Sequence, residues 1–316
     1  MTAPRTLKVW STAGLANRLK ALVSGRTLAE VAGRAFRFLW TPSAGCGAPF
    51  GALFTNRWAV DDLAELDPAL EAQHVTGWAL QIAAQLLDDP RPDIVLGTGD
   101  WLVPTGRTWP ALRDRCADLL NELTLQPPLV SRVLAFQARH FRPTMIGVHL
   151  RRGDFHHRRP DIIGNAEAAA AAVDRFLHRH PDAGIVLCTD DGASDGATSR
   201  REGLRERFIA RYGDRVAHPM PRSLDRRSVE GIEDALVELH LLRLTHMVVG
   251  TTGSSFSGLA AFGRNVPCVL VGGGGPRSRR PRPRVWQVRG HWLVHRARRF
   301  LRGGGQHAGR LDATKM

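Results

Sequence analysis

Short apolar runs alternate with helical patterns through the second half of the chain, and this alternation restricts the possible folds more than any other feature. The runs predict strands over residues 144–150, 185–189, 247–250 and 267–271. The segments between and beside them predict helices over residues 166–179, 200–212, 232–244 and 254–262. The strands are apolar throughout, as in parallel sheets that are covered on both faces. This order of elements predicts β-α-β units and a parallel sheet.

The first half shows the same pattern less clearly. It predicts strands over residues 7–10, 36–40 and 94–96, a helix over 17–32, and two helices between 109 and 140. Residues 41–60 are rich in glycine, proline and aromatic side chains, which predicts a loop. We therefore expect two α/β lobes that meet near residue 140, with the site in the cleft between them. The expected division is residues 1–140, residues 141–275 and a C-terminal extension over 276–316.

The chain of 316 residues carries a formal net charge of +14, and most of that charge lies in the C-terminal extension. Residues 276–316 hold twelve Arg or Lys and one acid, a net charge of +11. Four glycines (residues 272–275) precede the extension, which begins with an Arg/Pro-rich run, and both segments are unsuited to packing a core. Apolar residues further on predict that the extension docks on the body. The alternatives are a weak contact with an anionic membrane surface and a tail that binds nucleic acid.

Composition indicates an ordinary globular protein, with 43% apolar and 23% charged residues. No stretch approaches the roughly 20 apolar residues of a membrane span, and the N-terminus lacks the pattern of a signal peptide. We therefore expect a cytoplasmic location. The four cysteines are scattered, and Cys188 and Cys268 fall inside predicted strands, so we expect buried, reduced thiols.

The strand over 144–150 leads into the sequence MIGVHLRRGDFHHRRP (residues 145–160), where arginine and histidine follow an apolar run. Such a cluster is consistent with a solvated turn, a nucleic-acid patch, a metal site or an anion clamp. Parallel α/β sheets bind ligands beyond the carboxyl ends of their strands, which favours a functional role. The guanidinium groups of Arg151 and Arg152 match phosphate oxygens and keep their charge. Asp154 is placed to pair with Arg152.

Three other strand ends carry small or acidic residues. Gly14 and Asn17 follow the first strand and introduce a helix whose free N–H groups suit an anion, although a simple tight turn is the alternative. Asp190 and Asp191 suit a metal, a ribose or base edge, or a solvated turn. The stretch VVGTTGSSFS (residues 248–257) is a loop of small residues that leads into a helix, and its hydroxyl and backbone N–H groups suit a phosphate. It lacks the Gly-Lys-Ser/Thr of a P-loop, which disfavours an NTPase.

Taken together and in this order, the segments GLANR, GVHLRRGD, CTDD and GTTGSSFS resemble the GDP-fucose-dependent fucosyltransferases. That family includes protein O-fucosyltransferases, α-1,6-fucosyltransferases and their bacterial nodulation-factor relatives. The resemblance covers residues 7 to 271. It implies a GT-B fold of two Rossmann-like lobes, with GDP held by the C-terminal lobe and the acceptor on the N-terminal side. It also implies an inverting, metal-independent transfer from a GDP-sugar co-substrate, with no further cofactor.

By matching position, the resemblance implies that Arg151 grips the β-phosphate and stabilises the departing GDP. Arg152 and Asp154 would support that pocket, and Glu238 stands where the family has an aspartate that contacts the nucleotide. The residues implied to bind the nucleotide-sugar are Gly14, Asn17, His149, Arg151, Arg152, Asp190, Asp191, Glu238, Thr252, Ser254, Ser255 and Phe256. Fixed cations at a diphosphate also suit the charge that builds as this leaving group departs, so we expect no metal.

The chain departs from the family directly after Asp154. The α-1,6 enzymes have a lysine and then a glutamate there, whereas this chain has Phe155, His156 and His157. The acceptor base therefore does not carry over, and the candidates for it are Asp154, His157 and Asp100. A glycan, a peptide and a small metabolite all stay open as acceptors, and a GDP pocket alone does not identify the sugar as fucose.

Two other functions compete with a transferase. A binder of nucleic acid or of anionic surfaces would act through the C-terminal extension, and its binding would fall steeply with salt. Outside the extension no aromatic residues interleave with basic ones, so we expect no specific nucleic-acid partner. A metal-dependent hydrolase would use His149, His156, His157 and Asp190, a spacing that is a poor ligand pattern.

Overall fold

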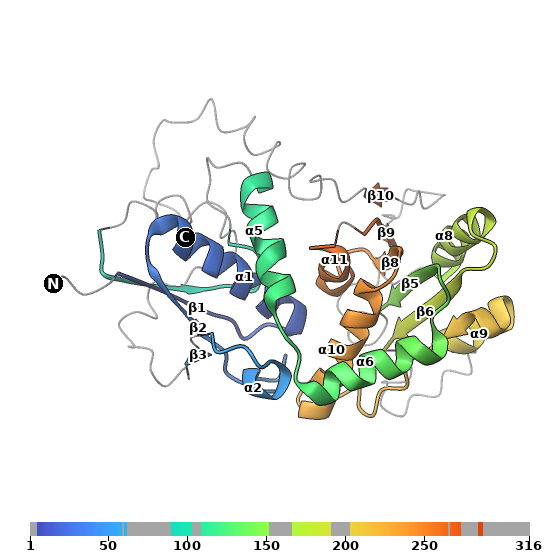
Figure 1. Cartoon of the computed structure of the whole chain (residues 1–316), viewed down its shortest axis with the longest axis horizontal. Coiled ribbons are helices and arrows are strands. Elements are labelled where there is room, and N and C mark those ends of the chain that lie inside the picture. Colours follow the sequence, from blue (N-terminus) through green and yellow to red (C-terminus); the bar gives the residue numbers. More distant parts are fainter. Residues whose placement is uncertain are drawn as a thin grey trace, which may run out of the picture.

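The computed structural model describes residues 5–58, 60–61, 90–102, 109–151, 166–190, 203–264, 266–272 and 284–286. These residues form two β-sheets, one from each half of the sequence, with helices packed on them (Figure 1). All strands of the first sheet and all but one of the second pair in parallel with their neighbours. The predicted α/β class with parallel sheets is therefore confirmed.

The first sheet has four strands in the order β3-β2-β1-β4. Their bounds are β1 (Thr6–Trp10), β2 (Ala35–Leu39), β3 (Val60–Asp61) and β4 (Asp93–Gly97). Helix α1 (Leu15–Ala32) links β1 to β2 and packs on both, and α5 (Trp109–Glu122) packs on α1. Leu7 and Val9 of β1 are buried in the hydrophobic core that the first sheet forms with α1 and α5. The carboxyl end of β1, where the predicted turn at Gly14 lies, is thus at the centre of the sheet.

Residues 41–60 are not wholly a loop, which corrects the prediction. They contain a short helix, α2 (Phe50–Leu53), and β3 begins at Val60. The ring centroid of Phe50 lies 5.4 Å from that of Trp40 and 4.9 Å from that of Phe54, and all three residues are buried. The aromatic side chains that suggested an irregular segment instead fold this part of the chain back onto the core.

The second sheet has six strands in the order β10-β9-β8-β5-β6-β7, of which only β10 is antiparallel to its neighbour. The strands are β5 (Met145–Leu150), β6 (Gly184–Thr189), β7 (Val216–Ala217), β8 (Met247–Thr251), β9 (Cys268–Val271) and β10 (Arg284–Trp286). The helices of this half are α6 (Pro127–His140), α8 (Ala166–Arg179), α9 (Leu204–Tyr212), α10 (Val229–Arg243) and α11 (Ser255–Ala261). β7 and β10 were not predicted, because two or three residues are too few to show a pattern. β10 lies in the C-terminal extension and pairs with β9, in agreement with the predicted docking on the body.

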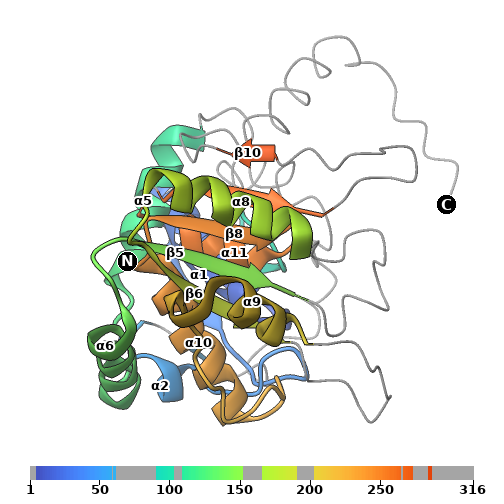
Figure 2. The same cartoon turned by 90° about the vertical axis from the view of Figure 1, so that its right-hand side faces the viewer.

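Different helices cover the two faces of the second sheet. Ile146, Val148 and Leu150 pack with side chains of α8 and α9 on one face. Figure 2 shows α8 and α9 in front of the sheet and α10 and α11 behind it. Side chains of α10 and α11, such as Leu236 and Leu259, belong to one hydrophobic cluster with those of β1, α1 and α5. A continuous apolar core therefore joins the two halves of the chain on the α10 and α11 side of the second sheet.

All four cysteines are free and buried, and Cys188 and Cys268 lie in β6 and β9 as predicted. Among the helices that the structure describes, none has the length and apolarity that crossing a membrane requires. The division at residues 140 and 275 and the cytoplasmic location stay predictions.

Candidate functional site

The carboxyl ends of three adjacent strands, β6, β5 and β8, meet at one edge of the second sheet. Asp190 follows β6, Arg151 follows β5 and Thr252 follows β8. Because the strands are parallel neighbours, the residues after their ends lie side by side, at the edge where such sheets bind ligands. Three strand ends that the sequence singled out are therefore brought together.

His149 lies one residue before the end of β5, in register with Cys188 on β6 and Gly250 on β8. Its side chain is buried, its Nδ1 lies 2.8 Å from the hydroxyl of Ser257, and its ring lies against Phe256 with centroids 4.7 Å apart. Burial, with a smaller effect of the Arg151 charge, lowers the pKa of His149 to about 3. The imidazole is therefore neutral at physiological pH, and it is too weak a base to take a proton from an acceptor hydroxyl.

The turn after β8 is fastened to the end of β5. The Thr251 hydroxyl accepts a hydrogen bond of 3.0 Å from the backbone N–H of Arg151, and Thr251 O accepts one of 3.0 Å from Ser254 N. Gly253 has φ +80°, a backbone conformation that glycine adopts without strain. Ser254 is buried, and its Oγ has no hydrogen-bond partner among the described residues. An unpaired buried hydroxyl costs about 1–3 kcal/mol, so Ser254 is suited to a polar ligand atom.

Glu238 lies on α10 and brings a carboxyl group close to this edge of the sheet. Part of the Glu238 residue is exposed, but its Oε1 atom is buried and makes no hydrogen bond with the described residues. Burial, followed by the negative charges of Asp234 and Asp190, raises the pKa of Glu238 to about 8. Glu238 therefore holds a proton at neutral pH.

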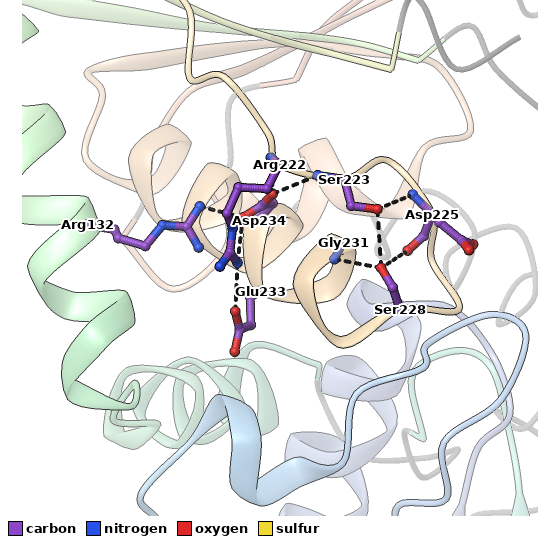
Figure 3. Close-up of polar contacts among 8 residues, drawn as sticks. All are labelled: Arg132, Arg222, Ser223, Asp225, Ser228, Gly231, Glu233 and Asp234. Atoms are coloured by element: carbon purple, nitrogen blue, oxygen red, sulfur yellow. Dashed lines mark hydrogen bonds and ion pairs between the residues drawn. The ribbon is translucent and has the colours of Figure 1, made fainter.

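A network around Asp234 holds the segment before α10 in place (Figure 3). The buried carboxylate of Asp234 accepts hydrogen bonds from Arg132 of α6 and from both the backbone and the side chain of Arg222. Burial alone would raise the pKa of Asp234, but the hydrogen bonds from Arg132 and Arg222 outweigh it and lower the pKa. Asp234 therefore stays charged one helical turn from Glu238, which explains part of the high pKa of Glu238.

The same segment touches the first half of the chain. Ser228 caps α10, its hydroxyl accepting a hydrogen bond of 3.0 Å from Gly231 N (Figure 3). Two residues earlier, Arg226 O accepts a hydrogen bond of 2.8 Å from Gly47 N. A Cβ on Gly47 would lie 1.9 Å from Arg227 O, so the two backbones are in direct contact there.

At the carboxyl end of β1, Gly14 caps helix α1, and its carbonyl accepts a hydrogen bond of 2.9 Å from Asn17 N. The turn is fixed by Arg18, which is fully buried and donates to Ala13 O (2.8 Å) and Thr41 O (2.6 Å). Asp100 follows β4, at the same edge of the first sheet, and pairs with Lys20 at 3.3 Å. Gly14 and Asn17 therefore follow the first strand, where the sequence predicted a turn into a helix. Asp100, which the sequence offered only as a candidate base, lies at the same sheet edge, and the sequence reasoning gave Arg18 no role.

Several predicted site residues lie outside the described part of the chain: Arg152, Asp154, His156, His157 and Asp191. Of the others, His149, Arg151, Thr252, Ser254, Ser255 and Phe256 come from the adjoining ends of β5 and β8, and Asp190 and Glu238 lie beside them. The sequence reasoning missed Ser257 and Asp234. Ser257 stands inside the motif GTTGSSFS, but only the packing of α11 on the sheet gives it a partner.

Within the described residues, no three His, Cys, Asp or Glu side chains gather as metal ligands would. The expected absence of a metal and of a further cofactor stays a prediction, because part of the histidine-rich segment lies outside these residues.

No family model matches the chain, and no curated protein matches its sequence. Solved structures do match. The Bradyrhizobium enzyme NodZ, an α-1,6-fucosyltransferase soaked with GDP-fucose, superposes with a TM-score of 0.61 at 17% identity over 90% of this chain and 99% of its own. The chain has the fold of this fucosyltransferase.

Two further transferases share that fold. A mutant of Arabidopsis thaliana FUT1 in complex with GDP matches with a TM-score of 0.58 at 14% identity, over 90% of this chain and 74% of its own. POFUT1 in complex with GDP matches with a TM-score of 0.51 at 10% identity, over 84% of this chain and 96% of its own. The structural likeness thus extends over most of each chain, and it agrees with the fold that the sequence motifs implied.

Proposed function

We propose that this protein is a glycosyltransferase that moves a sugar, fucose in the simplest case, from a GDP-sugar to an acceptor hydroxyl. One observation carries the proposal: Arg151, His149, Thr251 and Ser254 adjoin at the ends of β5 and β8 in a fold that is shared with enzymes solved with GDP or GDP-fucose. In this assignment the carboxyl edge of the second sheet holds the nucleotide, with the diphosphate at Arg151 and at the loop from Thr252 to Phe256.

The proposed reaction is an inverting displacement. The acceptor oxygen attacks the anomeric carbon of the sugar, the bond from that carbon to the β-phosphate oxygen breaks, and the acceptor proton passes to a base. Negative charge builds on the departing diphosphate, and the fixed guanidinium of Arg151 stabilises it. A protein cation in this place makes a metal unnecessary, which is why we propose a metal-independent reaction without a further cofactor.

The proposed candidates for the base are Asp154, His157 and Asp100. His149 is not a candidate, because its pKa of about 3 leaves it too weakly basic. Asp100 stands at the carboxyl edge of the first sheet and pairs with Lys20. Its use as the base requires the reaction to take place between the two sheets, where we propose that the acceptor binds.

Nucleotide binding tests the donor assignment directly. GDP should raise the melting temperature of the full-length protein in the presence of EDTA, since a ligand at a hundred times its Kd stabilises by about 2.7 kcal/mol. Arg151→Ala should remove this effect together with GDP-sugar hydrolysis. Arg207→Ala, which alters an exposed arginine on α9, is the matched control and should retain both.

The donor is identified by comparing GDP-, UDP- and dTDP-sugars for hydrolysis. A stabilising effect of UDP or dTDP without one of GDP would show that the donor assignment is wrong. Binding of nucleic acid that disappears when residues 276–316 are deleted, with no response to any nucleotide, would favour the function that the basic extension suggests.

A further inference from the structure

A buried hydrogen bond lies beneath the proposed nucleotide site and joins residues that are 108 positions apart. The Nδ1 atom of His149 on β5 lies 2.8 Å from the Oγ atom of Ser257 on α11. Ser257 is 0% exposed and His149 is 9% exposed. The bond belongs to no step of the reaction described above, although His149 adjoins Arg151 in sequence and in space.

The contact between His149 and Ser257 depends on the absence of a side chain at Gly250. His149 and Gly250 are register partners on adjacent strands, so they lie side by side on the same face of the sheet. A Cβ on Gly250 would lie 2.2 Å from the Cβ of Ser257. Because Gly250 leaves this space open, α11 approaches the sheet closely enough for the Ser257 hydroxyl to reach the imidazole. The Phe256 ring covers the imidazole, with an interplanar angle of 30°.

The direction of the hydrogen bond follows from counting donors. The Ser257 hydroxyl carries one hydrogen, and within the described residues Nδ1 is its one hydrogen-bond partner. If Nδ1 carried the proton and donated it, the hydroxyl hydrogen would be buried without an acceptor, at a cost of about 1–3 kcal/mol. The favourable arrangement has Ser257 donating to an unprotonated Nδ1. Since the ring is neutral, its single hydrogen then stands on Nε2.

We propose that Ser257 is a positioning residue that holds His149 in the Nε2–H tautomer, so that the ring offers an uncharged hydrogen-bond donor to an oxygen of the bound nucleotide-sugar. The identity of that ligand rests on the proposed function, whereas the tautomer does not. An uncharged donor directs an oxygen atom without adding to the positive charge that Arg151 supplies. The Nε2 atom makes no hydrogen bond with the residues that the structure describes, which leaves it available for this role.

NMR of the full-length protein with 15N-labelled histidine tests the tautomer without any ligand. The signals of His149 are assigned by their loss in His149→Gln. In the wild type we expect an unprotonated Nδ1 and a protonated Nε2 at every pH from 5 to 8, a range that lies above the pKa of about 3. Ser257→Ala removes the donor, so the two neutral tautomers should become mixed.

Ser24→Ala is the matched control, because Ser24 is a fully buried serine on α1 whose hydroxyl bonds elsewhere. It should leave the His149 signals unchanged even where it lowers stability. A protonated Nδ1 in the wild type overturns the proposal, and so does a tautomer that is unchanged in Ser257→Ala. The wild-type spectrum alone shows which ring nitrogen of His149 carries the proton, even if Ser257→Ala fails to fold.

Calorimetry with GDP tests the link to the ligand. Loss of the fixed donor should weaken GDP binding about tenfold in Ser257→Ala and leave it unchanged in Ser24→Ala. Unchanged GDP binding in Ser257→Ala, despite a mixed tautomer, overturns the role toward the ligand. If the wild type shows the expected tautomer but binds no GDP, the proposed function is wrong. The conclusion that Ser257 fixes the tautomer of His149 is then still supported.

Discussion

Two ionisable side chains near the proposed nucleotide site have pKa values that burial displaces in opposite directions. Burial disfavours the charged form of each group, so it lowers the pKa of His149 to about 3 and raises that of Glu238 to about 8. Both are therefore uncharged at neutral pH. Arg151 and Asp190 stand beside them, so the site combines one cation and one anion with two uncharged polar groups.

The high pKa of Glu238 predicts that the free energy of unfolding depends on pH between the ordinary pKa of 4.5 and about 8. Folded Glu238 keeps a proton that the unfolded chain releases above its ordinary pKa of 4.5, so the free energy of unfolding should fall as pH rises toward about 8 and then level off. Buried histidines act in the opposite direction, but only below about 6.5. Urea denaturation between pH 6.5 and 8 should therefore show a decline in the wild type that is smaller in Glu238→Gln.

Glu206→Gln provides the control, because it makes the same chemical change at an exposed glutamate of α9. It should retain the wild-type slope. Equal slopes in the wild type and Glu238→Gln would mean that Glu238 is ionised throughout this pH range in the folded protein.

At the scale of elements, close helix-to-sheet packing shapes the site. Gly147 and Gly250 both lie on the face of the second sheet that α10 and α11 cover. A Cβ on Gly147 would lie 2.8 Å from the Leu242 side chain of α10, and one on Gly250 would lie 2.2 Å from Ser257 of α11. The two glycines therefore set how closely these helices approach the sheet, and with it the position of the groups that the helices carry.

Gly250→Ala should destabilise the protein by about 1–3 kcal/mol, because α11 must move away from the sheet to admit the methyl group. It should also weaken GDP binding, since Ser254 and Phe256 flank the start of that helix. Urea denaturation and calorimetry measure the two effects. Gly258→Ala is the matched control on the same helix: its Cβ would meet nothing within 4 Å, and alanine favours a helix by about 0.5–1 kcal/mol. Destabilisation of equal size in both variants would contradict this account of Gly250.

At the scale of the whole molecule, polar contacts reinforce the apolar core between the two halves. On one side, Gly47 N donates to Arg226 O at 2.8 Å. On the other, the Asn121 side chain of α5 accepts a hydrogen bond from Arg243 at 2.6 Å and donates one to Gly263 O at 3.2 Å. Asn121 thereby uses both ends of its amide to join α5 to α10 and to the end of α11.

Gly47→Ala should loosen the first of these contacts, because its Cβ would lie 1.9 Å from Arg227 O. Backbone amides in both segments, 43–48 and 225–228, should then exchange hydrogen faster, as measured by mass spectrometry. Gly51→Ala in the nearby helix α2 is the control, since a Cβ there meets nothing within 4 Å. Faster exchange confined to residues 43–48 would show that the contact does not hold the second segment.

The sequence by itself was sufficient to predict the parallel sheets and the grouping of residues at their carboxyl edge. The four strands that were predicted in the second half are mainly apolar runs, which is a local pattern, and β-α-β connections place the ends of β5, β6 and β8 at the same edge. Arg151, Asp190 and Ser254 could therefore be placed near one another without coordinates. For residues 152–165 and 191–202 the prediction stays untested, because the described part of the chain does not include them.

Only the tertiary structure decided the properties that depend on contacts between distant segments. The neutral state of His149 comes from its burial, and its hydrogen bond comes from Ser257 on a helix that is far away in sequence. The high pKa of Glu238 comes from burial near Asp234 and Asp190. The aromatic residues of 41–60 join the core because Trp40 and Phe54 meet Phe50 there. Burial and charge are sums over neighbours in space, and the order of residues along the chain does not specify those neighbours.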